Sequence, residues 1–152
     1  MFTMKLTRPF WDILDLLNWR QAGDDEKVIN PVIEYLRKQS DDVIFQFDEQ
    51  MAEHLYAIDG KMWANSYRKA NGGVFSDDGF LYCRCVAIVN GQNYFNSVFA
   101  GRTKLDGTME FEAILSAPRK AWARKHKREV DEYPYITSTS YESGSNEALW
   151  KS

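Results

Sequence analysis

Cysteine and histidine are scarce in this sequence, which contains only Cys83, Cys85, His54 and His126. Two cysteines one residue apart cannot form the set of disulfides that staples a small secreted domain. A zinc site needs several histidine or cysteine ligands that converge, and so few scattered ligands do not provide them. We therefore expect neither a metal nor another cofactor, and we expect both thiols to be buried and unreactive.

Long apolar stretches are also missing. No run approaches the roughly 20 apolar residues that a membrane-spanning helix needs. Residues 1–9 lack the apolar centre of a signal peptide. These absences predict a cytoplasmic protein that has no membrane partner.

The motifs of common enzyme classes do not occur in the sequence. No serine stands in a nucleophile-elbow context, and no glycine-rich loop ends in Gly-Lys-Ser or Gly-Lys-Thr. Gly72 and Gly73 are too short a signal for a phosphate loop, and they suit the end of a helix. The sequence therefore favours a protein that is not an enzyme, without identifying its activity.

Aromatic residues, by contrast, are abundant, at 14% of the 152 residues. Their large side chains supply much buried area, so a chain of this length can form a hydrophobic core without staples. No internal repeat or low-complexity linker interrupts the chain. These features predict a single domain over residues 1–152.

Apolar residues recur at intervals of three and four along much of the chain, which predicts amphipathic helices. Thr7 and Ser40 stand where helix N-caps are expected, and Pro31 is expected to kink one helix or to restart it at Asn30. The predicted helices cover residues 8–22, 25–39, 40–58, 62–70, 108–116 and 118–127.

Residues 80–89 admit two predictions, because an unbroken apolar run of this length has no decisive period. The run is either a buried strand that enters a hairpin at Asn90 and Gly91, or a buried helix that Ser76 caps. The residues after Gly91 would form the returning strand in the first case.

The chain after residue 128 is polar and rich in serine and aromatic residues. Residues 133–141 have the composition of a strand, but Pro134 and the serines weigh against one. We expect residues 128–152 to form an extended tail that Tyr135, Tyr141 and Trp150 hold against the domain.

The densest group of candidate functional residues is Asp77 and Asp78, which follow Ser76. Two neighbouring carboxylates could bind a cation or exchange protons, but these residues also suit the capped start of a helix. Arg84 is the one charge in residues 80–89. A buried arginine needs a carboxylate, a cluster of carbonyls or an exposed groove, and we favour an ion pair.

Charge is unevenly distributed, although the net charge is only −3. Residues 1–60 hold twelve acidic and six basic side chains, an excess that either forms a solvated surface or suits a protein partner with a basic surface. Residues 119–128 carry six cations around Trp122. That run has the composition of a nucleic-acid footprint, but the acidic chain as a whole makes a nucleic-acid partner the weaker prediction.

Several of these residues also form a recognisable pattern. Over roughly residues 8–125 the sequence resembles a bacterial family known as domain of unknown function 4240. The resemblance rests on Phe10, Trp11, Ile13, Ile44, Phe47, Leu55, Tyr56, Gly72, Gly73, residues 76–80, Tyr82, Arg84 and Gly91.

The resemblance implies a mainly helical protein, and therefore a helix over residues 80–89 and another after Gly91. It implies no established activity, and residues 83–87 depart from the Phe-Arg-x-Trp-Leu-type stretch typical of the family. The predicted fold is mainly α, a single-domain orthogonal bundle of six or seven helices, with a helical core over residues 1–127 and an extended tail over residues 128–152.

Two functions remain open. The first is a non-enzymatic protein-binding module, in one version an immunity-type inhibitor that masks a basic toxin. The second is a small enzyme or ligand sensor. The candidate ligand- or partner-binding residues are Asp77, Asp78 and Arg84, with Trp11 and Tyr82 nearby; the oligomeric state is left open.

Overall fold

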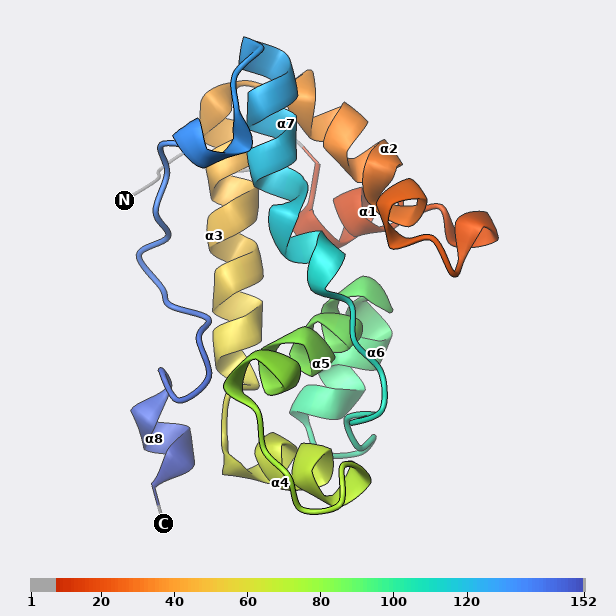
Figure 1. The fold of residues 1–152 in the computed structure, drawn as a ribbon, viewed down its shortest axis with the longest axis vertical. Helices are drawn as coiled ribbons and strands as arrows, with labels where there is room; N and C mark the ends of the chain where they lie inside the picture. Colours follow the sequence, from red (N-terminus) through yellow and green to blue (C-terminus); the bar gives the residue numbers. More distant parts are fainter. Residues whose placement is uncertain (1–7, 152) are drawn as a thin grey trace. The chain divides into compact units, whose positions relative to one another are not determined.

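The structure is a computed structural model that describes residues 8–151, and within this range it contains helices but no β-strand (Figure 1). The mainly α fold class is therefore confirmed. The α-helices are α1 (Phe10–Leu14), α2 (Asp25–Arg37), α3 (Asp41–Ala57), α4 (Lys61–Ala70), α5 (Asp77–Val89), α6 (Gln92–Phe99), α7 (Ala117–His126) and α8 (Glu147–Trp150). Short 3-10 helices cover Trp19–Gln21, Glu112–Ser116 and Val130–Glu132.

The chain divides into two compact units. Unit 1 comprises Met1–Gln50 and Ala113–Ser138, and unit 2 comprises Met51–Glu112 and Thr139–Ser152. Helix α3 contributes its first part to unit 1 and its last part to unit 2. The single domain expected over residues 1–152 stays a prediction.

In unit 1, the apolar face of α2 forms much of the core. Val28, Ile29, Val32, Ile33 and Leu36 are all buried there, as the helical spacing predicts. Helix α2 packs against α1 and α7 and continues through the proline at position 31, so the restart expected just before that proline is wrong. The packed face outweighs the one hydrogen bond that a proline removes.

Helix α1 is shorter than the pattern predicts. Pro9 is its N-cap, and Leu17 is buried although the helix has already ended at Leu14. Asn18 starts a separate 3-10 turn by accepting a hydrogen bond from the backbone N–H of Arg20. The expected cap at position 7 lies outside the described residues.

In unit 2, the ambiguous apolar run is a helix. Ser76 caps α5 by accepting a hydrogen bond from the backbone N–H of Gly79 at 3.1 Å, and every residue from Phe80 to Val89 except Tyr82 is buried. Gly91, at φ +96°, joins α5 to α6. The hairpin alternative is therefore wrong, and the helix implied by the family resemblance is confirmed.

The helix expected over residues 108–116 is only half present. It begins at Glu112 and has 3-10 geometry. Upstream, the Asp106 carboxylate accepts hydrogen bonds from both the backbone N–H and the hydroxyl of Thr108. This local bonding favours a turn over a helix.

The tail is mainly irregular, apart from one 3-10 turn and the four-residue helix α8. The strand-like composition of residues 133–141 does not produce a strand. In unit 1, Tyr133 donates a hydrogen bond to Asp48 and Tyr135 donates one to Glu49. None of the helices described in residues 8–151 is long and apolar enough to cross a membrane.

Candidate partner-binding site

Helix α5 carries four of the five residues that the sequence predicts as a site. Asp77 and Asp78 occupy its first turn and are exposed, where their charges complement the helix dipole. Tyr82 is half-buried one turn later, and Arg84 is fully buried. The two aspartates therefore do what acids at a helix start commonly do, and their carboxylates remain available at the surface.

The Arg84 guanidinium is enclosed by main-chain oxygens and one hydroxyl. Its Nη1 donates to the carbonyl of Leu55 at 2.8 Å, and its Nη2 donates to the carbonyl of Tyr141 at 2.9 Å and to the hydroxyl of Ser143 at 3.1 Å. Its Cζ lies 4.7 Å from the centre of the Phe80 ring, a cation–π distance. The side chain is 0% exposed.

The ion pair favoured for Arg84 is thus replaced by a carbonyl cluster. Among the described residues, no carboxylate forms an ion pair with it. Burial lowers the pKa of Arg84, while the charge of Asp59 acts in the opposite direction. The enzyme or sensor hypothesis stays a prediction, and it has no exposed guanidinium at this position with which to hold a ligand.

Asp59 is a second fully buried charge, and no motif in the sequence singles it out. Its carboxylate accepts hydrogen bonds from the backbone N–H of Gly144 at 3.1 Å, the backbone N–H of Asn146 at 3.0 Å and the indole N–H of Trp150 at 2.8 Å. Two of these donors are main-chain groups, which leave no trace in the sequence. Trp150 is the one partner of Asp59 whose side chain could have been noticed in the sequence.

Ser143 links the predicted residues to one another. Its hydroxyl accepts from Arg84 and donates to the main-chain carbonyl of Asp77 at 2.7 Å. The structure therefore connects Arg84 with the backbone of the aspartate and leaves the carboxylate out. Trp11 belongs to unit 1, where its ring packs edge-on against Phe10.

Three acidic residues act on the Tyr82 hydroxyl. Partial burial, a hydrogen bond with Glu112 and the charges of Glu112, Asp78 and Glu142 raise the pKa of Tyr82. These acids come from three separate segments of unit 2. We call the exposed carboxylates of Asp77, Asp78, Glu112 and Glu142, together with Tyr82, the acidic face.

The acidic face has the groups that bind cations: carboxylates and an aromatic ring. None of its four carboxylates forms an ion pair with another described residue. A tyrosine with an apolar ring and a polar tip is a favoured contact residue in protein interfaces. The arrangement can therefore bind lysine or arginine side chains through charge and through the ring.

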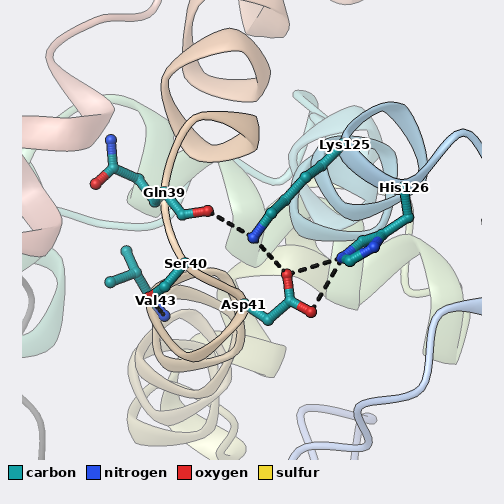
Figure 2. A network of polar contacts seen from close by, with 6 residues as sticks. All are labelled: Gln39, Ser40, Asp41, Val43, Lys125 and His126. Carbon is teal, nitrogen blue, oxygen red and sulfur yellow. Dashed lines mark hydrogen bonds and ion pairs between the residues drawn. The ribbon is translucent and has the colours of Figure 1, made fainter.

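The basic run in α7 has a different environment, because acids of unit 1 neutralise much of it. Lys120 pairs with Glu26, and Arg124 contacts Glu34 at 3.0 Å. Figure 2 shows Lys125 and His126 of α7 both meeting Asp41 at the start of α3.

In this cluster, the Asp41 Oδ1 lies 2.7 Å from Lys125 Nζ, in an ion pair, and at hydrogen-bond distance, 2.9 Å, from His126 Nε2 (Figure 2). Although burial opposes the change, the hydrogen bonds from Lys125 and His126 lower the pKa of Asp41. The cluster therefore fastens the two helices together within unit 1.

The cysteines, the metal-ligating side chains and the surface hollow do not form a further candidate site in the described part of the chain. Burial raises the pKa of Cys83 to about 12 and raises that of Cys85 as well, so both thiols stay protonated. Among residues 8–151, no group of three or more metal-ligating side chains converges. A hollow of about 470 Å³ on unit 1 contains the ion-paired Glu26 and Arg124, whose charges are already matched.

Comparison with known proteins gives one match. The profile of a family described as Protein of unknown function (DUF4240) matches residues 5–143. Neither the curated proteins nor the solved structures contain a match to this chain.

Proposed function

This chain belongs to the DUF4240 family, and from that premise we propose that it is a non-enzymatic protein-binding module whose acidic face docks a partner with a basic surface. The observation that carries the proposal is the set of exposed carboxylates in unit 2, at Asp77, Asp78, Glu112 and Glu142, that form no ion pair with a described residue. Burial, together with the hydrogen bond of Glu112 and the charges of Glu112, Asp78 and Glu142, also raises the pKa of the half-buried Tyr82. A surface built in this way concentrates negative charge around an aromatic contact.

The contrast with unit 1 supports this location. The acids that give residues 1–60 their excess charge include Glu26, Glu34 and Asp41, and these three are engaged by α7. The acidic face has no such internal partner among the described residues. An external cation is therefore the natural counter-charge for unit 2.

The biological version that we propose is an immunity-type inhibitor in the cytoplasm of a bacterium, which masks a basic toxin. The small helical chain and the lack of a converging metal cluster in its described part suit such a role. The two free, buried cysteines suit a reducing compartment. Electrostatic complementarity would give this complex fast association that weakens with salt.

The experiment compares two variants of equal charge change. In the first, Asp78→Asn, Glu112→Gln and Glu142→Gln neutralise the acids around Tyr82. In the second, Glu53→Gln, Asp131→Asn and Glu147→Gln neutralise three exposed acids elsewhere. Each is immobilised beside the wild-type chain for low-salt capture from the native host, and the Kd of a captured basic protein is then measured against salt.

The proposal predicts that the first variant loses at least tenfold in affinity, while the second stays within about threefold of the wild type. It also predicts that the wild-type Kd rises steeply with salt. Equal loss in both variants would mean that only net charge matters. Retention by both, or a salt-independent Kd, would refute docking on the acidic face.

A further inference from the structure

Residues 139–151, here called the C-terminal segment, contact unit 2 mainly through directed hydrogen bonds. Asp59 receives all three of its hydrogen bonds from this segment, and Arg84 donates two of its three to it. Asn146 adds a bond from its side-chain amide to the carbonyl of Tyr56 at 2.9 Å. The two fully buried charges of unit 2 are thus satisfied largely by one short stretch of chain.

An aromatic contact ends the segment. The Trp150 ring meets Phe75 and Phe80 edge-on, with ring centres 5.9 and 6.0 Å apart. Its indole N–H is at the same time bound to Asp59. A single side chain therefore inserts into an apolar wall while its polar tip reaches a charge, as an anchor residue does in a protein interface.

Gly60 makes room for this docking. A Cβ at this position would lie 2.7 Å from the Cβ of Leu149, 3.1 Å from the Leu149 carbonyl oxygen and 3.0 Å from the Trp63 ring. The φ of Gly60 is −163°, which any residue adopts, so the backbone itself does not require glycine. The absence of a side chain there serves the close approach of the segment.

The C-terminal segment contributes no hydrophobic side chain to the described core of unit 2. Leu149 is 40% exposed, and Asn146 is the one buried residue of the segment. The core consists of side chains from α3 to α6 and from residues 105–111. Removing the segment would therefore uncover the aromatic wall that Trp150 contacts and leave a carboxylate and a guanidinium without most of their partners.

We propose that unit 2 contains a peptide-docking groove, formed by Tyr56, Asp59, Gly60, Phe80 and Arg84, which the C-terminal segment fills as an internal ligand. The groove accepts in trans a partner polypeptide with the same chemistry. That chemistry is two nearby backbone N–H groups and an indole for Asp59, and a carbonyl with a hydroxyl for Arg84. The inference goes beyond the acidic face, with which it shares Glu142 of the C-terminal segment.

Tethering decides which ligand the groove holds. The C-terminal segment belongs to the same chain as its site, so its docking is intramolecular and the free chain keeps its own segment docked. A partner peptide enters when the internal segment is weakened or outcompeted. The C-terminal segment is then an autoinhibitory strap over a binding site.

The test uses the full chain with Asn146→Ala and Trp150→Ala, which weaken the strap and leave the groove unchanged. A fluorescently labelled synthetic peptide of residues 139–151 is titrated, and its anisotropy is measured. We expect binding at least tenfold tighter to this variant than to the wild type. Adding Gly60→Ala to the variant should remove the binding.

Two peptide variants sharpen the result. A peptide that carries Trp150→Ala should lose at least tenfold in affinity, while one with Glu147→Gln, which changes an exposed side chain, should bind like the natural peptide. Binding that survives both Gly60→Ala and the loss of the tryptophan would overturn the proposal. A folded variant that binds no peptide would overturn it as well.

Hydrogen exchange of the wild-type chain provides a second measurement that needs no variant. If the C-terminal segment is a displaceable ligand, its amides open at lower free energy than those of α5, in a separate step. If both sets of amides exchange only with global unfolding, the segment belongs to the cooperative core and the proposal fails.

Discussion

Arg84 and Asp59 show how single residues of unit 2 depart from what their types suggest. Each is 0% exposed, yet they do not pair with each other, and the main chain supplies most of their partners. Carbonyl and amide dipoles have no sequence signature. A buried arginine could be predicted to need partners, but which atoms supply them could not.

Replacing Arg84 by methionine should lower the free energy of unfolding by about 2–4 kcal/mol, because the carbonyls of Leu55 and Tyr141 lose their donors inside the protein. The free energy of unfolding of Arg84→Lys should lie between those of the wild type and Arg84→Met, since one ammonium cannot reach all three acceptors in the same geometry. Urea denaturation followed by circular dichroism measures both variants.

Arg68→Met is the matched control, because the Arg68 guanidinium lies 4.6 Å from the Phe75 ring but is not fully buried. It should cost less than about 1 kcal/mol. Equal losses at the two positions would contradict the role given to the enclosed guanidinium of Arg84.

Asp48 in unit 1 predicts an unusual dependence of stability on pH. Burial raises the pKa of Asp48 to about 6, although the hydrogen bond from Tyr133 and the charge of Arg119 oppose the rise. An unfolded aspartate titrates near 3.8. The folded chain therefore binds the extra proton between these values, and the Asp48 contribution to stability falls as pH rises from about 4 to about 6.

Asp48→Asn should remove this fall, because an amide can still accept the Tyr133 hydroxyl without carrying a charge. Above pH 6 the variant should be more stable than the wild type by about 1–3 kcal/mol, and near pH 4 the two should converge. Urea titrations from pH 4 to 8 give the difference directly. A difference that does not change with pH would show that Asp48 ionises normally.

At the scale of elements, the amphipathic helices such as α2 could be predicted from the sequence, but the segments that connect the helices could not. The inner face of α2 and the serine caps of α3 and α5 follow from spacing and residue type. The identity of α5 did not follow from its pattern, because a segment buried on nearly all sides has no polar stripe.

The candidate site was predictable to a similar degree. The position of the aspartates in the first turn of α5 follows from the sequence, whereas the sequence left open whether Arg84 is buried or lines an exposed groove. The positions of Glu112 and Glu142 beside Tyr82 depend on contacts between distant segments. No local pattern indicates those contacts, and the same reason hides the role of Asp59.

Gly79 tests how tightly α5 is packed in unit 2. A Cβ at this position would lie 2.2 Å from the Tyr67 hydroxyl and 3.2 Å from its Cζ. We expect Gly79→Ala to destabilise the chain by about 1–3 kcal/mol, although alanine is the better helix former. Tyr67→Phe in the same chain should recover part of the loss because it removes the nearest atom.

A double-mutant cycle of Gly79→Ala and Tyr67→Phe, measured by urea denaturation, quantifies this coupling. We expect the double variant to be more stable than the sum of the two single losses in unfolding free energy predicts. Additive losses would mean that some other contact of Gly79 is responsible, and a stabilising Gly79→Ala would mean that the site has room for a methyl group.

At the scale of the whole molecule, the charge pattern in the sequence changes meaning once the chain is folded. The acidic front and the basic run lie far apart in sequence, yet within unit 1 they join as ion pairs between α2 or α3 and α7. The charge that remains without an internal partner includes the acidic face of unit 2. The charge blocks of the sequence point to residues 1–60 as the docking surface, whereas the docking surface that we propose lies in unit 2.

The pairing of the basic run predicts that the chain does not bind nucleic acid. Of the six cations in residues 119–128, four already hold carboxylates: Lys120, Arg124, Lys125 and Arg128. Titration of a labelled DNA duplex and of a single-stranded RNA at low salt should give no change in anisotropy. Micromolar, salt-dependent binding would contradict the expectation.

The most direct test of the central claim is zero-length carboxylate-to-amine cross-linking of the complex between this chain and its captured basic partner, followed by mass spectrometry. Docking on the acidic face predicts cross-links from Asp78, Glu112 or Glu142 to lysines of the partner. Cross-links confined to acids of unit 1, such as Glu26 or Asp41, would contradict the account and move the interface to the other unit.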